Sequence, residues 1–133
     1  MATIKTEKGS DMISAIEAIN AINDVRSSEV VVATMTANRY WESVSNNQEM
    51  DLPVFGAMGK ASSVALGLAL SQPSKKIVVL DGDGSLLMNL GSLITVAGME
   101  PKNFLHFVFE DGAYRTTGGQ PIPGNGKFDL SAM

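Results

Sequence analysis

Hydrophobic and polar positions alternate along the chain in blocks, and the first kind of block is a short, unbroken apolar run. Such runs occupy 30–33 and 77–80, and 104–109 is apolar except for His106; polar or small residues follow each of the three segments. Unbroken apolar runs of this length are typical of strands that are buried on both faces of a sheet. The sequence therefore predicts three buried strands.

Between these runs lie longer segments whose apolar residues recur at the helical period. Isoleucine at every third position gives 12–25 a one-sided apolar stripe, and Ser10 is expected to cap this helix. A second helix is predicted over 61–70, where small residues allow close packing on a sheet, and a third over 86–98, with Ser85 as its N-cap. Strands that alternate with helices indicate a parallel sheet in a three-layer α/β/α fold.

The other segments are polar or rich in glycine and proline. The segment 43–51 is expected to be a surface loop, and a long loop is expected to follow the third strand as far as Met133. There is no internal repeat and no linker that would divide the chain. We therefore expect residues 1–133 to form a single domain.

The composition argues against a nucleic-acid-binding, membrane or secreted protein. The chain has 133 residues, 44% of them hydrophobic and 18% charged, which is enough for one compact core. The net charge is −4 and the ten Lys and Arg residues are scattered, so no nucleic-acid surface is expected. The chain has no cysteine, no apolar run long enough for a membrane span and no signal-peptide pattern at its start. These features favour a cytoplasmic protein without a membrane partner.

Polar side chains follow each predicted strand at its carboxyl end. Thr34 and Thr36 come after the first strand, Asp83 follows the second within Gly82-Asp83-Gly84-Ser85, and Asp111 follows the third. Ligands of parallel α/β sheets bind outside the carboxyl ends of the strands. Two carboxylates suit a divalent cation, and a glycine-rich turn before a helix suits a phosphate. The sequence therefore predicts a site for a metal-bound phosphate.

Three motifs resemble one family. Gly82-Asp83-Gly84 followed by Asp111, 28 positions after Asp83, resembles the signature of the diphosphate-binding (PP) domain of thiamine-diphosphate enzymes. Within that family, the segments 56–63, 81–91 and 116–121 are most similar to sulfopyruvate and phosphonopyruvate decarboxylases. The resemblance runs from about Glu29 to Pro121 and implies the PP-domain fold, with thiamine diphosphate and Mg²⁺ as cofactors.

The resemblance also implies roles for individual residues. Asp83, the Asp111 side chain and the Ala113 backbone carbonyl would be ligands of Mg²⁺, and the backbone of Gly56 would accept a hydrogen bond from the cofactor's aminopyrimidine. Met58 would be the wedge that bends the cofactor, although a methionine here can also be a core residue. The full set expected to contact the cofactor is Thr36, Gly56, Ala57, Met58, Gly82, Asp83, Gly84, Ser85, Asp111, Ala113 and Tyr114.

The chain departs from the family pattern at three places. Glu110-Asp111 stands where the family has Asn-Asn, and this adds negative charge beside the diphosphate. Gly56-Ala57-Met58-Gly59 lacks one hydroxyl of the family's Gly-Ser-Met-Gly, and Thr36-Ala37-Asn38-Arg39 replaces a Gly-Ser-Arg-Glu-like segment. An aspartate is still a competent oxygen ligand for Mg²⁺.

The family divides its active site between the PP domain and a pyrimidine-binding (Pyr) domain, which supplies the glutamate that activates the cofactor. These 133 residues have no room for both domains. The resemblance therefore implies a partner Pyr subunit in a hetero-oligomer, α2β2 or larger, that decarboxylates a small 2-oxo acid, and no catalytic residue is assigned to this chain. Glu17 and Glu29 are expected on solvated faces, and neither is expected to take the place of that glutamate.

Other functions are compatible with parts of the sequence. The chain could be a non-catalytic partner that holds the cofactor or regulates another subunit, or part of a carboligase that resembles acetolactate synthase. A receiver-like signalling domain is disfavoured because the first strand is not followed by an acidic pair. His106, the only histidine, is expected to be a strand residue and not a catalytic base.

Overall fold

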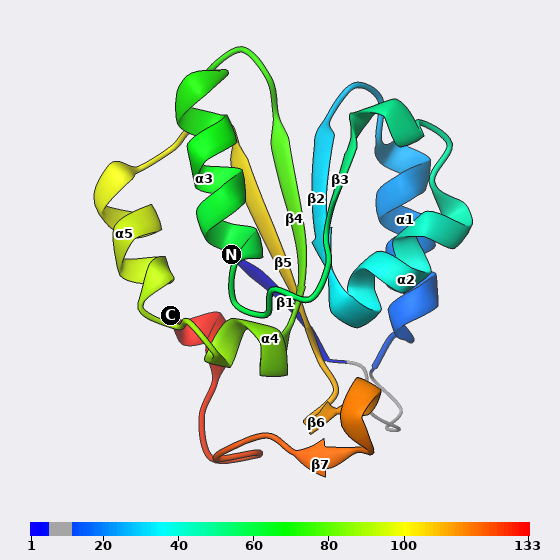
Figure 1. The fold of residues 1–133 in the computed structure, drawn as a ribbon, viewed down its shortest axis with the longest axis vertical. Coiled ribbons are helices and arrows are strands. Elements are labelled where there is room, and N and C mark those ends of the chain that lie inside the picture. Colours follow the sequence, from blue (N-terminus) through cyan, green and yellow to red (C-terminus); the bar gives the residue numbers. More distant parts are fainter. Residues whose placement is uncertain (6–11) are drawn as a thin grey trace.

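The computed structural model describes residues 1–5 and 12–133 and shows a parallel sheet between two layers of helices (Figure 1). The strands of the sheet are β1 (Ala2–Lys5), β2 (Val30–Thr34), β3 (Asp51–Val54), β4 (Ile77–Gly82) and β5 (Phe104–Glu110), in the order β1-β5-β4-β2-β3, all in parallel pairs. The helices are α1 (Ala15–Val25), α2 (Met35–Val44), α3 (Ala61–Ser71), α4 (Asp83–Leu87) and α5 (Ser92–Met99). The predicted three-layer α/β/α fold is confirmed.

Short elements complete the chain. The 3₁₀ helices are η1 (Gln48–Met50), η2 (Arg115–Thr117) and η3 (Leu130–Ala132), and β6 (Ala113–Tyr114) pairs with β7 (Gln120–Pro121) in a small antiparallel ribbon. No helix among residues 1–5 and 12–133 is long and apolar enough to cross a membrane.

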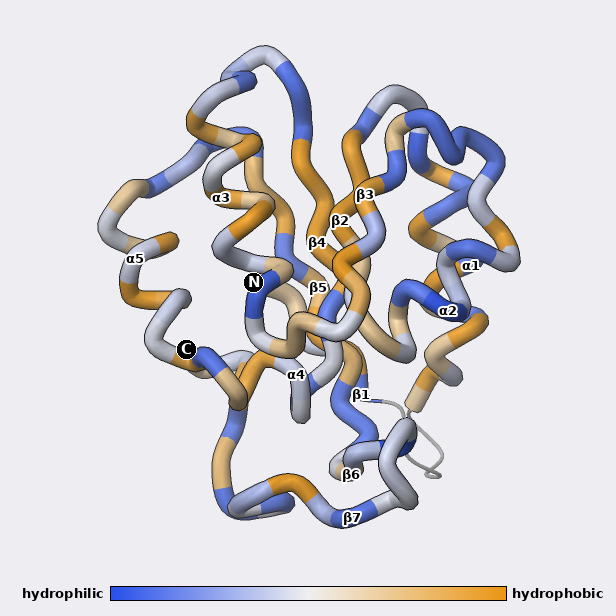
Figure 2. The backbone as a smooth tube through the Cα atoms, viewed as in Figure 1, coloured by the Kyte–Doolittle hydropathy of each residue, from blue (hydrophilic) through white to orange (hydrophobic). Residues whose placement is uncertain are grey.

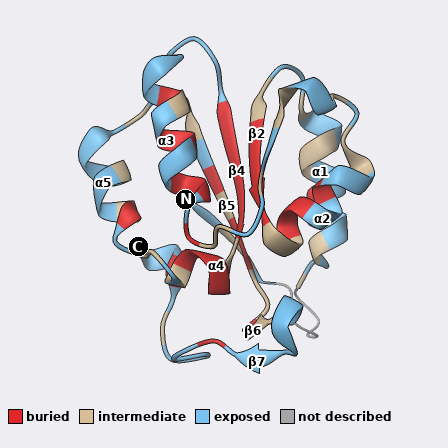
Figure 3. Cartoon of the chain, in the orientation of Figure 1, coloured by how far each residue is buried: buried red, intermediate tan, exposed pale blue. Residues whose placement is uncertain are grey.

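Each face of the sheet is covered by its own apolar cluster. On one face, Ile19 of α1 and Trp41 of α2 are buried against alternate strand residues such as Val31. On the other face, alanines of α3 pack against Val32 and Val79, and their small size lets the helix lie close to the strands. Neighbouring strand residues thus point to opposite faces, which explains the unbroken apolar runs of β2 and β4. These runs are hydrophobic in Figure 2 and buried in Figure 3.

The first helix is shorter than expected. It begins after Ser14, whose hydroxyl accepts the backbone N–H of Glu17 at 3.3 Å, while the Glu17 carboxylate accepts the Ser14 backbone N–H at 3.0 Å. This reciprocal pair satisfies two N–H groups that the helix end would otherwise leave free. Ser10, the expected cap, lies outside the described residues.

Four elements were not predicted from the sequence: α2, η1, β3 and β1. Residues 35–44 form α2, in which Ala37 and Trp41 place one buried stripe against the sheet. Part of the expected loop 43–51 is η1 and the start of β3, which pairs with β2 at the sheet edge. The strand β1 was also not predicted, and its main-chain pairing with β5 places it at the other edge.

The single helix predicted over 86–98 is wrong. The chain turns into α4 at Asp83, breaks at 88–91 and resumes as α5. Ser85 therefore lies inside α4, and its hydroxyl accepts the backbone N–H of Gly59 at 3.1 Å instead of capping a helix. Asn89 donates its side-chain N–H to the Gly59 carbonyl at 3.1 Å, so the break is anchored to the loop before α3.

Strand order places a crevice at one position in the sheet. The chain passes from β2 to β3 on one side and then returns to place β4 on the other side of β2. The helices of these two crossovers, α2 and α3, cover opposite faces, so they diverge at the carboxyl ends of β2 and β4 (Figure 1). Open α/β sheets bind ligands at this kind of reversal.

Candidate cofactor-binding cleft

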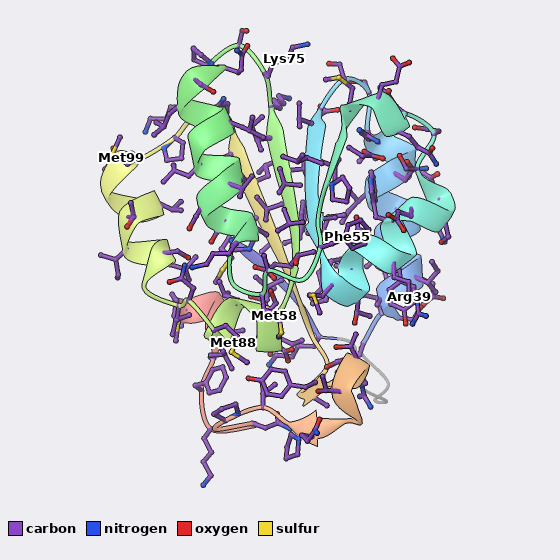
Figure 4. All side chains as sticks on the ribbon, in the orientation of Figure 1. Arg39, Phe55, Met58, Lys75, Met88 and Met99 are labelled. Carbon is purple, nitrogen blue, oxygen red and sulfur yellow. The ribbon has the colours of Figure 1, made fainter. Side chains whose placement is uncertain are left out.

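A cleft of about 720 Å³ opens at the carboxyl ends of β2, β4 and β5. This volume is in the range of pockets for small molecules and cofactors. Figure 4 shows Met58 near α4, at the centre of this edge of the molecule. Nine of the predicted residues line the cleft: Thr36, Met58, Gly82, Asp83, Gly84, Ser85, Asp111, Ala113 and Tyr114.

Two predicted residues lie apart from this lining. Gly56 and Ala57 belong to the loop between β3 and α3, and they are not among the residues that line the cleft. Gly56 has a φ of 63°, a conformation that favours glycine, and it turns the chain so that Met58 reaches the cleft. Contacts of Gly56 and Ala57 with a cofactor stay predictions.

Asp83 is held in one orientation by backbone donors from two segments. Its Oδ1 accepts the N–H of Gly84 at 2.6 Å, and its Oδ2 accepts the N–H groups of Asp111 at 3.1 Å and Gly112 at 2.8 Å. The residue is 3% exposed. Because a carboxylate offers about four lone-pair positions, these three bonds leave room for one cation.

Burial and hydrogen bonding shift the pKa of Asp83 in opposite directions. Burial raises the pKa of the Asp83 carboxyl and outweighs the hydrogen bonds from Gly112 and Gly84, which lower this pKa, while the negative charge of Asp111 raises it further. Burial also raises the pKa of Glu110, and the positive charge of Lys5 opposes that rise. A bound divalent cation would favour the ionised form of Asp83.

Asp111 reaches the same place from the end of β5. Its Oδ1 accepts the N–H of Ala113 at 3.0 Å, and its Oδ2 accepts the Nε–H of Arg115 at 3.0 Å. Arg115 also donates to the Asp111 backbone carbonyl at 3.3 Å, so one guanidinium forms hydrogen bonds with both the side chain and the backbone of Asp111. This pairing was not predicted, although an acidic and a basic residue four positions apart often form an ion pair.

Close backbone packing at Gly84 depends on the absence of a side chain. A Cβ on Gly84 would lie 2.6 Å from the Tyr114 ring and 3.2 Å from Ile122. Tyr114 and Ile122 belong to the segment that follows Asp111, so contact with Gly84 fixes that segment across the turn after β4. The glycine therefore allows the two carboxylate-bearing segments to meet.

The residues present fit a Mg²⁺-bound diphosphate. Asp83, Asp111 and the Ala113 carbonyl supply oxygen donors alone, which Mg²⁺ prefers. No three His, Cys, Asp or Glu side chains of residues 1–5 and 12–133 gather into a metal cage. Mg²⁺ usually takes one or two carboxylates and completes its shell with phosphate oxygens and water. The first residues of α2, which has no side-chain N-cap, line the same cleft and present free N–H groups suited to a phosphate.

Further residues line the cleft that were not predicted as site residues. Met35 has a φ of 49° at the start of α2, Arg39 and Tyr40 follow on that helix, and Ser14 and Ile16 come from the start of α1. Of these, only Arg39 belongs to a segment compared with the family pattern, Thr36-Ala37-Asn38-Arg39, and no site role was predicted for it. Only the packing of α1 and α2 on the sheet brings them to the carboxyl edge.

His106 is a buried residue of β5, as expected, and does not reach the cleft. Its Nε2 lies 3.7 Å from Oδ2 of Asp81, too far for a hydrogen bond. The other oxygen of Asp81 accepts the N–H of Gly82 at 2.9 Å. Asp81 and His106 thus belong to the strands β4 and β5, and Asp81 precedes the turn that carries Asp83.

Comparisons with known proteins also indicate a thiamine-diphosphate-binding domain. The family model of the thiamine pyrophosphate enzyme, C-terminal TPP binding domain, matches residues 29–132. Sulfopyruvate decarboxylase subunit beta of Methanothermobacter thermautotrophicus is 43% identical over 110 residues, which are 82% of this chain and 58% of that protein. Phosphonopyruvate decarboxylase of Streptomyces hygroscopicus is 47% identical over 75 residues, 56% of this chain and 18% of that protein. Probable acetolactate synthase 2 of Oryza sativa is 35% identical over 85 residues, 59% of this chain and 13% of that protein.

The matched region contains both aspartates that line the cleft, Asp83 and Asp111, and it includes β2 to β5 with the helices between them. The chain spans little more than half the length of its sulfopyruvate decarboxylase relative. The chain belongs to the family of the C-terminal TPP-binding domain of thiamine pyrophosphate enzymes.

Proposed function

We propose that the chain binds thiamine diphosphate and Mg²⁺ as the PP half of a two-subunit 2-oxo acid decarboxylase, with sulfopyruvate or phosphonopyruvate as its substrate. One observation carries this proposal: Oδ2 of Asp83 accepts the N–H groups of Asp111 and Gly112. These bonds hold the start of the segment that carries Asp111 and Ala113 against Asp83, at the ends of two neighbouring strands. A Mg²⁺ ion held by one or two carboxylates and a diphosphate would be suited to oxygen donors placed in this way.

The chain's own residues would bind and orient the cofactor. Asp83, Asp111 and the Ala113 carbonyl would hold the cation, while the Thr36 hydroxyl and the N–H groups at the start of α2 would hold the diphosphate. Met58, which also lines the cleft, would be the wedge that bends the cofactor. Bound thiamine diphosphate supplies the electron sink that decarboxylation of a 2-oxo acid requires.

A partner chain would complete the site. The described carboxylates of the cleft, Asp83 and Asp111, are both committed to the proposed cation, so neither is left to activate the cofactor. The relative named as a beta subunit supports assembly with a second kind of subunit. We propose a Pyr-type partner that contributes a glutamate, in an α2β2 or larger hetero-oligomer.

Two other functions fit the same cleft. The rice relative favours a carboligase, but its identity of 35% is below the 43% of the sulfopyruvate relative, and it matches a smaller share of the chain. A non-catalytic cofactor-holding subunit would keep the same ligands. Turnover with a partner separates these possibilities.

The test is complementation. The purified chain with Mg²⁺ and thiamine diphosphate should release no CO₂ from sulfopyruvate or phosphonopyruvate, and release should begin when a Pyr-type subunit from the same genome is added. A partner whose activating glutamate is replaced by glutamine is the matched control and should give no release. Rapid turnover by the isolated chain would refute the half-site proposal, and formation of acyloin without aldehyde would favour the carboligase.

A further inference from the structure

Arg39 is a positive charge in the cleft that has no partner among residues 1–5 and 12–133. Among the described residues, Arg39 and Arg115 are the cationic ones that line the cleft, and Nε of Arg115 lies 3.0 Å from Oδ2 of Asp111. Arg39 makes no hydrogen bond or ion pair with the rest of the described chain, residues 1–5 and 12–133. An arginine that lines a cleft without an internal partner is available to a ligand.

The position of Arg39 separates it from the proposed metal ligands. Thr36, Arg39 and Tyr40 lie on one face of α2, one turn apart, and all three line the cleft. Thr36 is in the first turn of α2, next to the strand ends, and Arg39 follows one turn later along the helix. Figure 4 shows Arg39 at the side of the molecule and Met58 near its centre. The cleft therefore has an acidic end at Asp83 and Asp111 and a basic wall on α2.

The chemistry of the proposed substrates decides what a guanidinium could bind. Sulfopyruvate and phosphonopyruvate each carry two anionic groups, the carboxylate that leaves as CO₂ and a distal sulfonate or phosphonate. A cation on the departing carboxylate would stabilise the charged ground state more than the transition state toward neutral CO₂, and this would slow the reaction. A cation on the distal group has no such cost, because that charge is the same before and after CO₂ leaves. Planar guanidinium donors also match tetrahedral oxyanions in a two-point contact.

We infer that Arg39 forms a subsite for the distal sulfonate or phosphonate and thereby selects dianionic 2-oxo acids over pyruvate. This inference rests on the proposed function. It assigns Arg39 to substrate specificity and leaves cation and diphosphate binding to Asp83, Asp111 and Thr36.

The test measures binding to the chain loaded with Mg²⁺ and thiamine diphosphate. Because the isolated chain is expected not to turn over, sulfopyruvate, phosphonopyruvate and pyruvate can be titrated at equilibrium and followed by amide shifts in NMR spectra. The wild-type chain should bind the two dianions on the order of 10- to 100-fold more tightly than pyruvate, the effect of one charge-assisted contact. Arg39→Ala should abolish this preference, and Arg39→Lys should keep part of it. Lys75→Ala removes the same charge at an exposed site at the other end of the molecule and should not change the preference (Figure 4).

Cofactor binding is measured first on every variant, because it separates the two proposals. A wild-type chain that does not bind thiamine diphosphate refutes the proposed function. If the cofactor binds but the wild-type chain shows no preference for dianions, or Arg39→Ala keeps that preference, only the subsite inference is overturned. Weaker cofactor binding by Arg39→Ala, with the preference unchanged, would also overturn it, because Arg39 would then serve the diphosphate.

Discussion

At the scale of single residues, Asp83 and Asp111 differ in how their charges are balanced. Asp83 is buried and relies on backbone N–H groups, whereas the Asp111 side chain is 27% exposed and pairs with Arg115. The extra negative charge that Asp111 introduces in place of asparagine is thus partly offset within the chain. The departure from the family motif and its compensation lie four residues apart.

This compensation predicts coupling between the two residues. Arg115→Ala should weaken Mg²⁺-dependent binding of thiamine diphosphate by about two- to fivefold, because a partly exposed ion pair contributes up to about 1 kcal/mol. In an Asp111→Asn background, which should bind the cofactor at least as tightly as the wild type, the same Arg115 change should have little effect. Calorimetric titration of the four proteins gives the coupling, and tighter binding by Arg115→Ala alone would show that Arg115 competes with the cation.

At the scale of elements, the contact between the loop before α3 and the break between α4 and α5 shapes the cleft. The Gly59 backbone donates to Ser85 and accepts from Asn89, so the turn that carries Asp83 is tied to the loop that carries Met58. Gly59 has a φ of 72°, and a Cβ there would lie 2.8 Å from the Asn89 Cβ and 2.9 Å from its backbone nitrogen.

Two glycines of this loop offer a matched comparison. Gly56→Ala introduces strain from its positive φ alone, since nothing lies within 4 Å of the added Cβ, and should cost roughly 1–2 kcal/mol of unfolding free energy. Gly59→Ala adds a backbone clash to similar strain and should cost about 1–3 kcal/mol more. Urea denaturation of both variants measures the difference. Equal destabilisation would mean that α4 and α5 can move away from the loop without loss.

At the scale of the whole molecule, the proposed cofactor ligands come from segments that the sheet brings together, so cofactor binding is expected to stabilise the fold. Asp83 follows β4 and Asp111 follows β5, and the two strands are paired along their length. A ligand that binds the folded chain alone stabilises it by about 2.7 kcal/mol at 100 times its dissociation constant.

Mg²⁺ and thiamine diphosphate together should therefore raise the melting temperature by about 10 °C for a chain of this size. Either one alone should have a much smaller effect, because in the proposed site the cation would join the protein to the diphosphate. Asp83→Asn keeps an acceptor for backbone N–H groups but removes the charge, and it should lose most of the shift, whereas Asp24→Asn, on the exposed end of α1, should retain it. Differential scanning calorimetry makes the measurement, and a full shift in Asp83→Asn would remove this residue from the metal site.

The sequence by itself determined the parallel α/β class, three of the five strands of the sheet, and the placement of Asp83 and Asp111 directly after two of them. These features are written in local patterns, because apolar runs and helical periods lie within a few neighbouring residues. Only the tertiary structure decided that 35–44 is a helix, that β1 and β3 form the sheet edges, and that the segment after Asp83 breaks into α4 and α5. It also decided that Arg39 lies on the cleft wall. Each of these depends on pairing or packing between residues far apart in the chain, such as β1 with β5 or Gly59 with Asn89, and no local window contains both partners.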